Sequence, residues 1–151
     1  MKKKILISIP AYNEANNIRP LYKKLNETLE EKRDEVDFEI LFINDGSKDN
    51  TVSEVLSLIE QTDNVSLIDL SRNYGKEIAM SAGFDYSTHD AVITMDADLQ
   101  HPPATIIDMI DLWQQGYEDV YAKRNQRKGE SWFKKTSSKW FYKVLGKLAN
   151  T

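Results

Sequence analysis

Short apolar runs alternate along the chain with longer segments in which apolar residues recur at helical spacing. The runs are rich in β-branched residues and predict strands. They lie at Ile5–Ile9, Phe38–Ile43, Val65–Leu70, Ala91–Met95 and Val120–Ala122. Helices are expected between them at Ile18–Lys32, Thr51–Gln61, Lys76–Tyr86 and Pro103–Gln115. Strands that alternate with helices predict an α/β fold with a mainly parallel sheet flanked by helices.

Polar segments follow the first four predicted strands. These segments are Pro10–Glu14, Asn44–Ser47, Ser71–Lys76 and Asp96–Asp98. Parallel sheets bind ligands at the carboxyl ends of their strands, where the loops of neighbouring units converge. The sequence therefore predicts one binding site built from these four strand ends.

Composition narrows the possible functions. A chain of 151 residues with 40% hydrophobic and 29% charged residues is typical of one globular domain. Its formal net charge of -4 disfavours nucleic acid as the main partner, and the absence of cysteine excludes disulfides and thiolate chemistry. The first apolar run is too short for a signal peptide core, and no later run reaches the length of a membrane span.

The character of the chain changes after Arg124, where a basic and aromatic segment begins. In residues 131–150, lysines recur at i, i+4 spacing opposite an apolar stripe, which predicts an amphipathic helix. Such a helix can lie on a membrane surface, with its lysines toward anionic headgroups, or pack against the domain core. We expect a core domain at residues 1–125 and a basic amphipathic helical segment at residues 126–151.

The triplet Asp96-Ala97-Asp98 follows a predicted strand directly. Two carboxylates beside one small residue can face a common cavity and hold a hard divalent cation through their oxygens. Such a cation would stabilise a diphosphate leaving group. The alternative is that one aspartate caps the next helix while the other is solvated.

Taken together, the four polar segments resemble those of family 2 glycosyltransferases, in the same order along the chain. The last of them continues as Asp96-Ala97-Asp98-Leu99-Gln100-His101-Pro102-Pro103. The similarity is greatest to the bacterial polyprenyl-phosphate (bactoprenol) glucosyltransferases and the dolichol-phosphate mannose synthases. It implies a Rossmann-like GT-A nucleotide-sugar-binding domain.

The resemblance implies a nucleotide pocket and a metal site. The pocket would be lined by Pro10, Ala11, Tyr12, Glu14 and Asp45. Tyr12 would stack on the base unless it is packed in the core. Glu14 and Asp45 would accept hydrogen bonds from the base or ribose, and the Asp45-Gly46-Ser47 segment could serve at the same time as a turn and helix cap.

By the same resemblance, Asp96 contacts the nucleotide sugar, Asp98 ligates Mg²⁺ or Mn²⁺, and Gln100 is a further ligand. These two aspartates are the predicted catalytic residues. Gly75 and Lys76 lie where a helix is predicted to start, so backbone N–H groups and the Lys76 ammonium could approach the diphosphate or the sugar. The alternative is that Lys76 is a solvated surface lysine.

Arg124 and Arg127 either bind phosphate or belong to a basic loop. His89, in a predicted turn, is expected to be exposed.

The implied reaction is the inverting transfer of a sugar to a polyprenyl phosphate or another glycosyl acceptor, at the inner, cytoplasmic face of the cell membrane. UDP-glucose is the expected donor. Alternatives are an enzyme that uses GDP-mannose, as dolichol-phosphate mannose synthases do, a polysaccharide glycosyltransferase, and a nucleotide-sugar-binding module without turnover. Because related enzymes continue beyond a position equivalent to Thr151, we expect an N-terminal fragment with weak or absent transfer.

Overall fold

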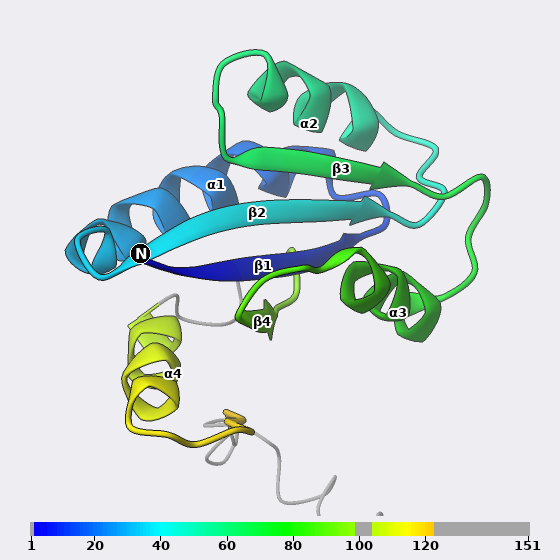
Figure 1. The fold of residues 1–151 in the computed structure, drawn as a ribbon. Helices are drawn as coiled ribbons and strands as arrows, with labels where there is room; N and C mark the ends of the chain where they lie inside the picture. Colours follow the sequence, from blue (N-terminus) through cyan, green and yellow to red (C-terminus); the bar gives the residue numbers. More distant parts are fainter. Residues whose placement is uncertain (1, 99–103, 123–151) are drawn as a thin grey trace, which may run out of the picture. The chain divides into compact units, whose positions relative to one another are not determined.

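The computed structural model describes residues 2–98 and 104–122 (Figure 1). The chain divides into two units, Met1–Val120 and Tyr121–Thr151. The predictions for Gln100, Arg124, Arg127 and residues 131–150 lie outside the described residues, and the predicted division at residues 125 and 126 stays a prediction. Within the described ranges, no helix has the length and apolar character needed to cross a membrane.

The predicted parallel sheet is confirmed. Its strands are β1 (Lys3–Ala11), β2 (Val36–Asn44), β3 (Val65–Asp69) and β4 (Ala91–Thr94), in the order β3-β2-β1-β4 (Figure 1). In the parallel ladders, Ile7 of β1 lies opposite Ile40 of β2 and Ile93 of β4. The strand order reverses at β1, because β2 and β3 extend from one side of it and β4 pairs with the other.

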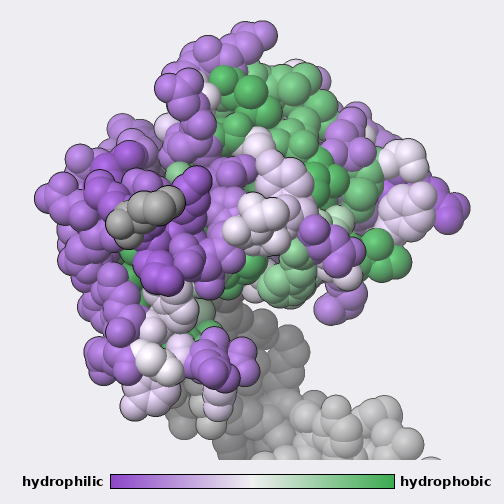
Figure 2. Space-filling model, in the orientation of Figure 1, coloured by the Kyte–Doolittle hydropathy of each residue, from purple (hydrophilic) through white to green (hydrophobic). Residues whose placement is uncertain are grey.

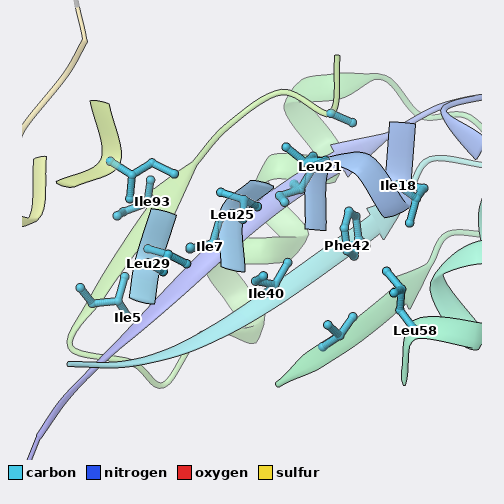
Figure 3. Close-up of a cluster of buried hydrophobic side chains, with 14 of the residues drawn as sticks. Ile5, Ile7, Ile18, Leu21, Leu25, Leu29, Ile40, Phe42, Leu58 and Ile93 are labelled. Atoms are coloured by element: carbon cyan, nitrogen blue, oxygen red, sulfur yellow. The ribbon is translucent and has the colours of Figure 1, made fainter. Parts of the chain in front are cut away.

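Helices cover both faces of the sheet, as predicted. They are α1 (Ala15–Leu29) with a following 3₁₀ turn η1 (Glu30–Lys32), α2 (Thr51–Ile59), α3 (Lys76–Tyr86) and α4 (Ala104–Gln114). The buried residues of α1 recur every three or four positions and form one apolar stripe, at Ile18, Leu21, Leu25 and Leu29. They pack on alternate residues of β1 and β2, including Ile5, Ile7, Ile40 and Phe42 (Figure 3). The same core includes buried residues of α2 and α4.

The opposite face of the sheet is covered by α3. Gly83 of α3 lies so close to β1 that a Cβ atom there would be 2.3 Å from the Ser8 hydroxyl oxygen. The rest of α3 is less buried, since Ile78 and Phe84 are 52% and 51% exposed. Figure 2, in the orientation of Figure 1, shows that this face of the molecule carries an apolar area bordered by hydrophilic residues.

The strand predicted at Val120–Ala122 is wrong, because these residues form no strand and have no ladder partner among the described residues. Tyr121 is 83% exposed. The apolar side chain of Val120 instead lines a cavity of about 140 Å³ beside β4, together with Ile93 and Trp113. Apolar residues alone do not predict a strand here, because strand formation also requires a neighbouring strand to pair with.

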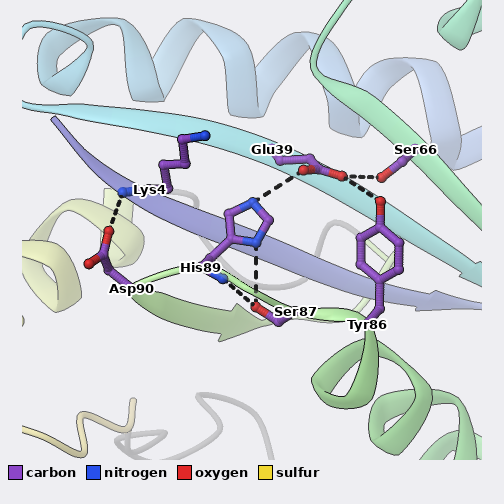
Figure 4. A network of polar contacts seen from close by, with 7 residues as sticks. All are labelled: Lys4, Glu39, Ser66, Tyr86, Ser87, His89 and Asp90. Carbon is purple, nitrogen blue, oxygen red and sulfur yellow. Dashed lines mark hydrogen bonds and ion pairs between the residues drawn. The ribbon is translucent and has the colours of Figure 1, made fainter. Parts of the chain in front are cut away.

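The expectation that His89 is exposed is also wrong. Its side chain is 10% exposed, and its Nε2 atom lies 3.1 Å from Oε2 of Glu39 on β2 (Figure 4). The other carboxylate oxygen of Glu39 accepts hydrogen bonds from the hydroxyls of Ser66, at 2.6 Å, and Tyr86, at 3.3 Å. The partner of His89 is fifty residues away in the chain, so the local turn sequence does not reveal it.

The next residue, Asp90, fixes the start of β4 against β1. Its Oδ2 accepts the backbone N–H of Lys4 at 2.8 Å, and its Oδ1 forms an ion pair with Lys3 at 3.0 Å. The Lys4 hydrogen bond, followed by that of Lys3, holds the pKa of Asp90 below its ordinary value.

Candidate functional site

The four polar strand ends converge on one cleft of about 340 Å³, which we call the switch-point cleft. It is lined by Pro10, Ala11, Tyr12, Glu14, Asp45, Asn73, Gly75, Lys76, Asp96, Ala97 and Asp98. Segments that follow β1 and β4 are among them, so the cleft lies where the strand order reverses. This is the position at which open parallel sheets bind their ligands.

The loop after β1 is joined to the loop after β2 by hydrogen bonds. Asn13 has a left-handed backbone, with φ 57°, which asparagine tolerates better than most residues. Its N–H donates to the Ser47 hydroxyl at 2.9 Å, and its Oδ1 accepts the Lys48 N–H at 2.8 Å. The N–H of Glu14 donates to the Thr51 hydroxyl at 2.9 Å. These contacts fix the backbone that carries Tyr12 and Glu14.

Asp49 connects the same two loops to the start of α2. Its Oδ2 accepts the Ala15 N–H at 3.1 Å, and its Oδ1 accepts the N–H and hydroxyl of Thr51 at 3.0 and 2.5 Å. Burial raises the pKa of Asp49, but the hydrogen bonds from Thr51 and Ala15 outweigh burial and bring this pKa below its ordinary value. Asn50, at the N-cap position, makes no capping side-chain hydrogen bond.

Asp45 connects the end of β2 to the loop before α3. It is 3% exposed, and its two carboxylate oxygens accept the N–H groups of Tyr74, at 2.7 Å, and Gly75, at 3.0 Å. Gly46 approaches the same loop so closely that a Cβ atom would lie 2.3 Å from the carbonyl carbon of Arg72. The predicted binding residue Asp45 therefore holds the loop that leads to Lys76.

Lys76 and Asp96 meet across the cleft. Lys76 is the first residue of α3, and its ammonium forms an ion pair with Oδ1 of Asp96, which follows β4. The two side chains are 54% and 34% exposed. Both interpretations offered by the sequence, the phosphate contact and the solvated lysine, stay predictions.

Tyr12 and Glu14, from the loop after β1, also line the cleft. Tyr12 is 43% exposed, so the interpretation as a packed core aromatic is wrong and its ring is accessible to a flat ligand. Glu14 accepts a hydrogen bond from the Asn17 amide at 2.5 Å. These two residues provide a stacking surface beside a hydrogen-bond acceptor.

On the neighbouring loop, the Arg72 guanidinium lies 4.7 Å from the centre of the Tyr74 ring. The hydrogen bond with Ser71, followed by the interaction with Arg72, lowers the pKa of Tyr74. This loop therefore carries a fixed cation beside the cleft residues Asn73 and Gly75.

The carboxylates of the cleft can hold a divalent cation if a bound phosphate group and water supply its other ligands. In the part of the chain that the structure describes, no group of three or more His, Cys, Asp or Glu side chains is placed to hold a metal. Asp96 and Asp98 line the same cleft, and Asp96 already attracts a cation, the Lys76 ammonium. Mg²⁺ commonly uses one or two protein carboxylates and takes its other ligands from phosphates and water. The donor set is compatible with a metal shared with a bound diphosphate.

Sequence reasoning did not name Asn73 as a lining residue, although it singled out the segment that contains it. Gly75 has φ 96° and occupies the N-cap position of α3. The prediction that Gly75 and Lys76 lie where a helix starts is confirmed, and this backbone conformation favours a residue without a Cβ atom.

Comparison with known proteins identifies the chain. The family model described as glycosyl transferase family 2 matches residues 6–150. The chain belongs to glycosyl transferase family 2. It is 44% identical over 148 residues to an uncharacterized glycosyltransferase of Synechocystis sp., covering 98% of this chain and 46% of the relative. It is 42% identical over 147 residues to a prophage bactoprenol glucosyl transferase homolog of Escherichia coli K12, covering 97% of this chain and 47% of the relative.

A solved structure with the same fold is a mannosyltransferase from Pyrobaculum calidifontis in complex with GDP-Man and Mn²⁺. The TM-score is 0.60 at 23% sequence identity, and the match covers 71% of this chain and 31% of that chain. The chain therefore has the GT-A fold of its family. It spans about half the length of the curated relatives that it matches.

Proposed function

We propose that this glycosyltransferase takes a sugar, glucose from UDP-glucose, and transfers it to a polyprenyl phosphate with inversion at the anomeric carbon. The observation that carries the proposal is the switch-point cleft, which combines an exposed aromatic ring, an ammonium and four carboxylates at the ligand-binding edge of the sheet. The bactoprenol glucosyl transferase homolog, 42% identical over almost the whole chain, supports glucose as the sugar and a polyprenyl acceptor.

Each part of the cleft has a chemical task in this proposal. The ring of Tyr12 stacks on the uracil base, while Glu14 accepts a hydrogen bond from the base or ribose. Lys76, at the start of α3, neutralises diphosphate oxygens together with the N-terminal backbone of the helix. Asp45 acts from behind the cleft by holding the Tyr74 and Gly75 backbone.

Transfer is proposed to proceed by single displacement. The acceptor phosphate oxygen attacks the anomeric carbon, the bond from that carbon to the diphosphate breaks, and the nucleoside diphosphate leaves with the electron pair. Asp96 and Asp98 would hold Mg²⁺ or Mn²⁺, which supplies neutralisation of the leaving diphosphate. A phosphate acceptor is already anionic, so this step requires less deprotonation than attack by a hydroxyl.

Predicted residues outside the described ranges complete the proposal. Gln100 would be a further metal ligand, and Arg124 and Arg127 would contact the donor diphosphate or the acceptor phosphate. The acceptor, the sugar and the membrane surface are proposals, because the curated relatives are about twice as long as this chain.

Calorimetric titration of the chain with UDP, GDP and their sugars, each with and without Mn²⁺, tests the donor assignment. We expect binding that depends on Mn²⁺ and favours UDP over GDP. Preference for GDP-mannose would instead support the mannosyl donor found in the Pyrobaculum structure. Absence of metal-dependent binding to all of these nucleotides would refute the proposed function.

A charge-removing variant tests the metal site. Asp98→Asn keeps the size of the side chain but removes its charge, so Mn²⁺-dependent nucleotide binding should fall at least about tenfold while the fold survives. The matched control is Asp63→Asn, an exposed residue before β3 that does not line the cleft. Equal binding by the two variants would place the metal elsewhere.

A further inference from the structure

The starting observation is the ion pair between Lys76 and Asp96 inside the switch-point cleft. Lys76 is the one basic residue among the described residues that line this cleft. Its ammonium contacts the carboxylate that the proposed function assigns to the sugar nucleotide and its metal. A divalent cation and an ammonium bound to the same carboxylate each weaken the binding of the other, because the two positive charges repel.

We infer that Lys76 is an exchangeable counter-ion of Asp96, displaced by a divalent cation and then available to the diphosphate. This inference rests on the proposed function and adds a coupling between its two ligands. A cation at Asp96 and Asp98 releases the ammonium, and the released ammonium favours an anion nearby. Binding of the cation therefore increases the affinity for the nucleoside diphosphate through Lys76, in addition to the direct contact between the two ligands.

The geometry restricts the exchange to the lysine side chain. The backbone before Lys76 is fixed, because the N–H of Gly75 donates to the buried Asp45 carboxylate at 3.0 Å. The lysine side chain itself is 54% exposed and has four flexible carbon–carbon bonds, so it can change partners without movement of α3. Ion pairs at this degree of exposure are weak, which makes displacement by a divalent cation inexpensive.

Of the other acidic residues of the cleft, Asp98 is assigned to the cation in this proposal, and Asp45 and Glu14 already accept hydrogen bonds. Asp45 uses both oxygens for backbone N–H groups, and Glu14 accepts the Asn17 amide at 2.5 Å. Release from Asp96 therefore directs the ammonium toward an incoming anion rather than toward one of these two carboxylates.

Mn²⁺ binding in the absence of nucleotide tests the exchange directly. The free Mn²⁺ is measured by electron paramagnetic resonance for the wild-type chain, for Lys76→Met and for Lys48→Met, an exposed lysine that does not line the cleft. We expect Lys76→Met to bind Mn²⁺ alone about threefold to fivefold more tightly, the scale of one weak ion pair that no longer competes. Lys48→Met should bind like the wild type.

The second measurement is the coupling between the two ligands. For UDP and GDP, the ratio of dissociation constants without and with Mn²⁺ should be smaller in Lys76→Met than in the wild type, while nucleotide affinity itself falls. Unchanged or weaker binding of Mn²⁺ alone by Lys76→Met overturns the exchange, even where the wild type binds Mn²⁺ and nucleotide together. A wild-type chain that binds no nucleotide with Mn²⁺ overturns the proposed function and this inference with it.

Discussion

Gly46 is the position at which a single added methyl group tests how the cleft is assembled. It has φ +67°, and a Cβ atom there would lie 2.3 Å from the carbonyl carbon of Arg72 and 2.4 Å from the nitrogen of Asn73. Gly46→Ala therefore incurs a left-handed backbone cost of about 1–2 kcal/mol. It also incurs an overpacking cost of about 1–3 kcal/mol, because the obstructing atoms belong to the backbone.

The expected loss in unfolding free energy is about 2–5 kcal/mol, a large part of the stability of an ordinary domain. Urea denaturation followed by circular dichroism measures it. The displaced loop carries Asn73 into the cleft, so nucleotide affinity should fall in the same variant. A smaller stability loss with strongly reduced nucleotide binding would mean that the loop moves aside instead of straining the fold.

Gly116 provides the matched control. Its φ is +100°, and a Cβ atom there would meet no atom within 4 Å. Gly116→Ala thus carries backbone strain of about 1–2 kcal/mol without the collision. If Gly46→Ala lost no more stability than Gly116→Ala, close contact between the loops after β2 and β3 would be refuted.

Three further predictions concern polar side chains outside the Lys76–Asp96 pair. Asp45→Ala removes the acceptor of two backbone N–H groups and should lower the unfolding free energy by about 2–4 kcal/mol, with Asp45→Asn losing less because it retains one oxygen. Ser8→Ala removes a buried hydroxyl that has no hydrogen-bond partner in the structure as described, and should stabilise the protein by about 1 kcal/mol. It should also reduce the cost of Gly83→Ala in a double-mutant cycle, since the added Cβ would strike that hydroxyl. The folded-state pKa values of Asp49 and Asp90 lie below the ordinary 3.8, so their stabilisation is present above that pH and is lost as pH falls through the lowered values. Denaturant midpoints measured from neutral pH downward should fall in this acidic range, and a midpoint that rises there would contradict the assignment.

Local periodicity was sufficient to predict the framework of the fold. Four apolar runs became β1 to β4 because each carries enough buried β-branched and aliphatic side chains to occupy a sheet. The helix predicted at Lys76–Tyr86 has the same bounds in the structure, after a glycine that suits its N-cap. The same approach failed at Val120–Ala122, where apolar character reflected burial of one side chain and not strand pairing.

The polar strand ends could be assigned to one site because parallel strands bring their carboxyl ends to the same edge. How these residues pair with one another depended on loop geometry that the chain order does not reveal. Asp45 proved to hold the Tyr74 and Gly75 backbone, and His89 proved to be paired with Glu39 on a distant strand.

Sequence alone determined the family motifs, the order of strands and helices, and the acidic, aromatic and basic residue types available for chemistry. Tertiary structure alone decided that the cleft lies at the reversal of strand order and that Lys76 at the start of α3 contacts Asp96 after β4. The reason is physical: periodicity records which side chains are buried within an element. Contacts between loops depend on how separate elements pack, and the residues involved are twenty or more positions apart.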